Sequence, residues 1–68
     1  MSLKKKSFSL SGHRTSVALE AEFWVVLEDA AQGSSLASLV GQIDAQRGPR
    51  PLASALRLHA LALVRGRI

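Results

Sequence analysis

The sequence predicts a small, mainly α-helical fold in which one short strand leads into three helices. Residues 13–19 alternate between two kinds of side chain, as a strand with one buried face does. Two later segments, 20–32 and 34–46, carry apolar residues at the three- and four-residue spacing of amphipathic helices. A last segment, 51–65, is apolar on nearly every side. These patterns fit one small domain.

The composition of the chain excludes some classes of function and favours others. The chain has 68 residues and no cysteine, which excludes disulfides and thiolate metal sites. Its hydrophobic share of 47% is high for this size and favours apolar area buried against another subunit. The net charge of +4 favours polyanionic partners, nucleic acid before anionic lipid. We expect no secretory or membrane-spanning segment, and therefore a cytoplasmic protein.

The predicted strand divides its side chains between two faces. The inward set is Thr15, Val17 and Leu19, and the outward set is Arg14, Ser16 and Ala18. No partner strand is evident in the chain, and a lone strand is unstable because its backbone donors and acceptors need a ladder. The simplest partner is the same strand of a second chain, which predicts an obligate homodimer. Such a two-stranded ribbon fits the DNA major groove.

Three segments follow from the breaks in the pattern. Residues 1–12 are expected to form a basic flexible arm containing Lys4–Lys6, with a brief extended segment around Phe8 and Leu10 as the alternative. Residues 13–48 form the core, with Gly33 ending the first helix and Ser34 or Ser35 capping the second. Residues 49–68 form the third helix and a C-terminal tail, after a break at 48–51.

The order of these elements, with its residues, resembles the ribbon-helix-helix DNA-binding family. The residues that carry the likeness are His13–Val17, Leu19-Glu20, Glu22–Trp24, Ser35-Leu36, Ile43-Asp44 and Leu52–Arg57. The resemblance covers about residues 7–64 and is nearest to a small bacterial subfamily found mainly in α-proteobacteria. The third helix is additional to the two-helix core of the fold.

The resemblance implies a homodimeric, sequence-selective transcription regulator. Its paired strands would insert in the major groove, with Arg14, Ser16 and Ala18 contacting bases. Backbone N–H groups at Ser34 and Ser35 would bind a phosphate, as helix N-termini do. Four helices would intertwine beneath the ribbon as one core. The expected dimer core is Thr15, Val17, Leu19, Phe23, Leu27, Leu36, Leu39, Val40 and Ile43.

Several residues on and near the strand have more than one candidate role. Lys5, Lys6 and His13 are candidate phosphate contacts. Arg14 has the alternative of pairing with Glu20 or Glu22 on an exposed face. Ala18 departs from the polar reader that many family members carry, because alanine can only touch a thymine methyl. No motif for catalysis, metal binding or a cofactor is apparent, so none is predicted.

Two other functions compete with DNA binding. The broad apolar surface of the third helix favours a protein-interaction or oligomerisation scaffold, including an antitoxin-like role. A basic helix bound at a membrane surface, over 56–68, ranks last because its apolar face is too broad and its charges too few.

Overall fold

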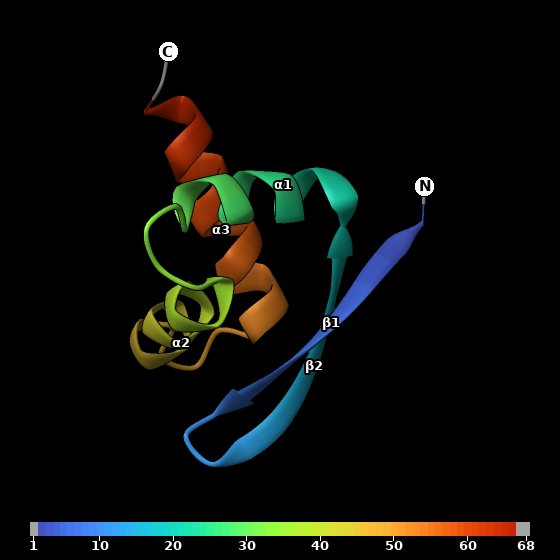
Figure 1. Ribbon diagram of the computed structural model, residues 1–68, viewed down its shortest axis with the longest axis vertical. Coiled ribbons are helices and arrows are strands. Elements are labelled where there is room, and N and C mark those ends of the chain that lie inside the picture. The colour runs from blue at the N-terminus through green and yellow to red at the C-terminus, as the bar shows by residue number, and fades with distance from the viewer. Residues whose placement is uncertain (1, 67–68) are drawn as a thin grey trace.

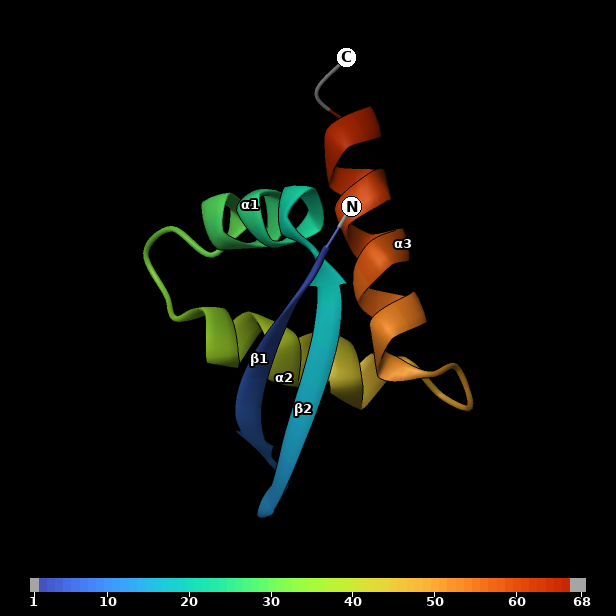
Figure 2. The ribbon, with the colours of Figure 1, turned by 90° about the vertical axis from the view of Figure 1, so that its right-hand side faces the viewer.

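The computed structural model describes residues 2–66, and in these a two-stranded antiparallel sheet is followed by three helices (Figure 1). The strands are β1 (Leu3–Leu10) and β2 (His13–Glu20). The helices are α1 (Ala21–Ala30), α2 (Leu36–Gln46) and α3 (Leu52–Arg65). All three helices lie on one side of the ribbon, and α2 passes behind it when the ribbon faces the viewer (Figure 2). The predicted mainly α fold with a ribbon and an additional third helix is confirmed.

Strand β1 is the main difference from the sequence prediction. Residues 3–10 were expected within a flexible arm, with a brief extended segment around Phe8 and Leu10 as the alternative. They form a full strand that pairs antiparallel with β2, from Leu3 opposite Glu20 to Leu10 opposite His13. Residues 2–66 therefore contain two strands rather than the one that was expected. Phe8 and Leu10 are 7% and 8% exposed, so the apolar positions of the supposed arm bury as much as those of a core strand. This pairing removes the physical reason for expecting the ladder partner of β2 in another chain.

A two-residue turn makes the hairpin. Ser11 and Gly12, between β1 and β2, both have positive φ, at 51° and 82°. Positive φ at both central residues is the pattern of a type I′ turn, whose twist matches that of the flanking strands. Gly12 tolerates this conformation because it has no Cβ. The break seen at Gly12 in the sequence is thus the tip of a hairpin.

Trp24 fastens β1 to the first helix. Its indole Nε1 donates to the carbonyl oxygen of Lys4 at 2.8 Å, and its ring centroid lies 6.0 Å from that of Phe8. The side chain is 2% exposed. The ammonium of Lys6 lies 5.7 Å from the same ring and 3.7 Å from Glu28 Oε2, so β1 is attached to α1 along several residues.

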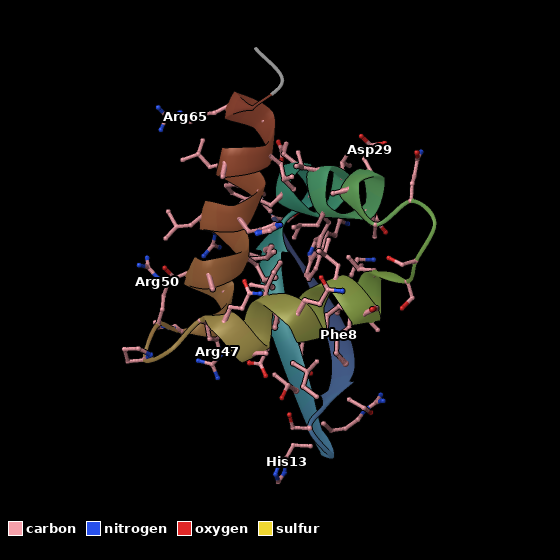
Figure 3. The ribbon with its side chains drawn as sticks, turned by 90° about the vertical axis from the view of Figure 1, so that its left-hand side faces the viewer. Phe8, His13, Asp29, Arg47, Arg50 and Arg65 are labelled. Carbon is pink, nitrogen blue, oxygen red and sulfur yellow. The ribbon has the colours of Figure 1, made fainter. Side chains whose placement is uncertain are left out.

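The core lies between the inner face of the ribbon and the helices. Of the nine residues predicted for a dimer core, Val17, Leu19, Leu27, Val40 and Ile43 are buried within this one chain, while Thr15, Phe23, Leu36 and Leu39 are half-buried. The structure adds Phe8, Leu10, Trp24, Leu52, Ala55, Leu56 and Ala60. Figure 3 shows Phe8 on the ribbon below α2. Both strands and all three helices therefore contribute to one core within a single chain.

The helix boundaries follow their local signals closely. Ser35 caps α2, because its hydroxyl accepts from the backbone N–H of Ser38 at 3.0 Å. Helix α1 ends at Ala30, two residues earlier than predicted, in a turn that reaches Gly33 at φ 88°. Helix α3 ends at Arg65, and residues 67–68 of the expected C-terminal tail lie outside the described part of the chain. No helix within residues 2–66 is long and apolar enough to cross a membrane.

An ion pair joins the end of the ribbon to α3. The Nε of Arg57 donates to Glu20 Oε1 at 3.0 Å, and its guanidinium lies 5.8 Å from the ring of Phe23. A hydrogen bond to its own backbone, with the guanidinium of Arg57, lowers the pKa of the Glu20 carboxyl below its ordinary value of 4.5. The pair thus stabilises the folded state in the form where Glu20 is ionised.

This pair predicts a specific loss of stability in acid. A lowered folded-state pKa adds stability above pH 4.5 that disappears as the pH falls through the folded value. We expect Glu20→Gln to be less stable than the parent at neutral pH and to lose less stability on acidification below pH 4.5. Denaturant unfolding at a series of pH values measures this. Glu22→Gln, on the exposed first turn of α1, should keep the parental slope; equal slopes for the parent and Glu20→Gln would contradict the role of the pair.

Candidate nucleic-acid interface

The outer face of the ribbon points away from all three helices (Figure 1). Residues directly opposite each other in an antiparallel pair share a face, so the register sorts the side chains. The outer face carries the pairs Lys5 with Ala18, Ser7 with Ser16, and Ser9 with Arg14. All six are exposed except Ala18, which is half-buried. The outer face therefore consists mainly of small side chains, with Lys5 toward one end and Arg14 toward the other.

The three predicted base-contacting residues lie together on this face. Arg14, Ser16 and Ala18 alternate along β2 with the inward residues Val17 and Leu19, as the sequence pattern indicated. The alternative for Arg14, an ion pair with Glu20 or Glu22, is not formed, and Glu20 instead bonds Arg57. Within residues 2–66 the guanidinium of Arg14 has no hydrogen bond or ion pair, which leaves its donors available to a ligand.

Strand β1 contributes two residues that were not predicted to lie in the site, Ser7 and Ser9. Like the predicted phosphate contact Lys5, they come from the segment expected to be a flexible arm. The hydroxyls of Ser7 and Ser16 lie 2.9 Å apart across the ribbon, within hydrogen-bond distance. The alternation of serines with Phe8 and Leu10 was the available signal for this second strand.

The predicted phosphate contacts are spread over several places. His13 lies at the tip of the hairpin (Figure 3), and Lys5 lies on the outer face. Lys6 instead lies on the inner face, half-buried and next to Glu28. At α2, Ser35 is the N-cap, while the hydroxyl of Ser34 donates to the carbonyl of Ala31 at 3.4 Å. The N-terminal end of α2 lies to one side of the ribbon in Figure 2.

Acidic side chains flank the ribbon, whereas its outer face carries basic ones. Glu20 and Glu28, which flank it, are paired with Arg57 and Lys6. Between Lys5 and Ser9 on β1, and between Arg14 and Ala18 on β2, there is no acidic residue. The outer face is therefore cationic without an acid among its central positions, which suits a polyanion.

A comparison with known families agrees with this geometry. A family model described as "Ribbon-helix-helix domain" matches residues 3–64, which is nearly the whole chain. The chain belongs to the ribbon-helix-helix domain family. Ribbon-helix-helix domains generally bind DNA as transcription regulators, are typically dimeric and are typically not enzymes. No curated protein and no solved structure matches the chain.

In this ribbon-helix-helix protein the family match begins at residue 3, so it includes β1. The resemblance seen in the sequence began at about residue 7 and assigned the ribbon to β2 alone. The outer face of the present ribbon is thus built by two strands of one ribbon-helix-helix chain. Within residues 2–66 there is no group of three side chains suited to hold a metal ion.

Proposed function

We propose that this protein is a sequence-selective transcription regulator that inserts the outer face of its ribbon into the DNA major groove. The observation that carries the proposal is the exposed face of small side chains with Lys5 and Arg14, on the side of the ribbon opposite the helices. The major groove is about 12 Å wide and admits a two-stranded ribbon. Small hydroxyl side chains allow the ribbon to approach the base edges closely.

Arg14 is the residue we assign to direct base recognition. A guanidinium can donate two parallel hydrogen bonds to O6 and N7 of guanine, which discriminates by about 1–3 kcal/mol. Ser16, two residues along the same face, can donate or accept. Ala18 offers only a methyl group, which suits contact with thymine, so we expect β2 to read sequence mainly through its first two outer positions.

We assign the phosphate contacts to the N-terminus of α2 and to the basic residues of the hairpin. Backbone N–H groups in the first turn of a helix lack intrahelical partners and bind anions. Ser34 and Ser35 precede that turn, and no acidic residue stands in it. Lys5 and His13 would add affinity without reading sequence, as would Lys6 if its contact with Glu28 opens.

The assignment of Arg14 is tested by two substitutions with different effects. We expect Arg14→Ala to weaken binding to a selected DNA site by about 1–3 kcal/mol and to relax its preference at one base pair. Arg14→Lys keeps the charge but lacks the rigid planar pair of donors, so it should weaken the preference while retaining the salt dependence. Fluorescence anisotropy on selected and scrambled DNA at several salt concentrations measures both.

Arg50→Ala is the matched control for charge. Arg50 is exposed on the connection between α2 and α3, away from the ribbon (Figure 3). The substitution Arg50→Ala should therefore leave the base preference unchanged. If Arg14→Ala and Arg50→Ala have the same selectivity as the parent protein, base recognition by Arg14 is excluded.

A second function, as an oligomerisation scaffold, is favoured by the outer side of α3. Leu58, Leu61 and Val64 are 45%, 48% and 38% exposed along one stripe of this helix. Beside them a groove of about 210 Å³ runs between α1 and α3, with Phe23 and Val26 in its lining. Ribbon-helix-helix proteins are typically dimeric. We propose that this chain forms a homodimer and that the stripe of α3 contributes to its interface.

Sedimentation tests the proposed interface on α3. We expect Leu61→Glu to shift the protein from dimer toward monomer, because it places a charge within the contact. Gln42→Glu adds the same charge to an exposed position of α2 and should sediment like the parent. A parent protein that stays monomeric at high micromolar concentration, or a Leu61→Glu dimer of unchanged stability, would contradict an interface on α3.

A further inference from the structure

The hydrogen-bonded pair Ser7–Ser16 lies at the centre of the outer face. The two residues stand directly opposite each other in the ladder, and both are exposed. Their hydroxyl oxygens are 2.9 Å apart, and either can be the donor. The pair is flanked on one side by Ser9 with Arg14 and on the other by Lys5 with Ala18. It is therefore the central polar group that a groove-bound ribbon would present.

The number of hydroxyl protons determines which hydrogen bonds the Ser7–Ser16 pair can form with a ligand. Each hydroxyl has one O–H donor and two lone pairs, so the pair has two donors in all. One donor is used between Ser7 and Ser16. The hydroxyl that accepts this bond keeps its own proton free, and the hydroxyl that donates keeps its lone pairs free. The pair thus presents one donor beside one acceptor, at the 2.9 Å separation of the two oxygens.

The base edges in the major groove differ in whether they match this pattern. Adenine places an acceptor, N7, next to a donor, the N6 amino group. Guanine places two acceptors side by side, N7 and O6, and would require two donors. Satisfying both would break the hydrogen bond between the serines. Cytosine and thymine each present a single polar group at this edge, so neither engages both hydroxyls.

We propose that Ser7 and Ser16 act together as a reader of adenine, with one strand of the hairpin supplying each hydroxyl. The proposal rests on the function proposed above, since it requires the outer face of the ribbon to lie in the major groove. It makes Ser7 of β1 a specificity-determining residue equal to Ser16 of β2. The arrangement resembles the single amide side chain by which asparagine or glutamine contacts adenine, but it is divided between two residues.

The distance between Arg14 and Ser16 along β2 predicts how far apart the two bases that they contact lie. Arg14 precedes Ser16 by two residues on the same face, a distance of about 7 Å along a strand. Successive nucleotides of one DNA strand rise by about 3.4 Å, so two positions on the ribbon match about two base steps. One hairpin is then expected to specify a guanine and, about two base pairs away, an adenine. Either member of each base pair can lie on either DNA strand.

Selection of bound DNA from a random pool, repeated for a set of variants, tests the proposal. The parent protein should select a motif that contains a G·C pair and an A·T pair about two steps apart. Ser7→Ala and Ser16→Ala should each reduce the preference at the A·T pair, from about tenfold to near twofold, and leave the G·C pair unchanged. Ser7→Thr keeps the hydroxyl and should keep the preference. Ser54→Ala, on α3, serves as the matched control.

Each other outcome overturns the proposal in a recognisable way. If Ser16→Ala loses the A·T preference while Ser7→Ala retains it, recognition comes from β2 alone. If both variants select the parental motif, the pair does not read a base, although the protein remains a selective DNA-binding protein. If the parent selects no motif, the proposed function fails and this inference fails with it. Circular dichroism of each variant verifies that the hairpin and helices still fold.

Discussion

The pairing of β1 with β2 is the constraint on which the rest of the structure depends. A strand needs a neighbour for its backbone donors and acceptors, and here each paired residue has its partner three to seventeen positions away in the same chain. The pairing places Phe8 and Leu10 beside Val17 and Leu19 as one apolar surface. The helices pack on that surface, so the other face of the ribbon is left without cover.

The attachment of the ribbon to the helices is as important as its internal pairing. A two-stranded hairpin alone is marginally stable in water. Trp24 donates to the backbone of β1, and Arg57 of α3 bonds Glu20 where β2 meets α1. The hairpin is therefore held near both strand ends that lie opposite the turn. This anchoring fixes which face of the ribbon looks outward, and the proposed contacts with DNA depend on that orientation.

The helices were predictable because their signals are local. Apolar spacing, the serine cap at Ser35 and the break before Leu52 each act over a few residues, and the structure follows all of them. The inward and outward sets of β2 were also predictable, because alternation fixes the face of each residue once a strand exists. Phe23, which was predicted for the core, is only half-buried, whereas Trp24 is buried because it faces β1.

The role of β1 was not predictable in the same way. Three consecutive lysines suggest a solvated tail, and only the fold shows that Lys6 can lie over Trp24 while Lys5 faces outward. The hairpin turn is formed by Ser11 and Gly12. Serine is not among the residues that favour positive φ, so this turn has only a weak signal in the sequence. Because β1 was not predicted, its half of the outer face was not predicted either, and this half includes Ser7 and Ser9. A long-range pairing thus determined the part of the site that local patterns did not.

The pairing within one chain is tested most directly by asking whether β1 and β2 of the ribbon come from the same molecule. Labelled (¹³C, ¹⁵N) and unlabelled protein are mixed, unfolded and refolded together, and isotope-filtered nuclear Overhauser spectra are recorded. We expect contacts between β1 and β2, such as Lys5 with Ala18, within the labelled chain, and we expect them to be missing from the spectrum that detects only contacts between chains. Contacts between β1 of one chain and β2 of another would contradict it.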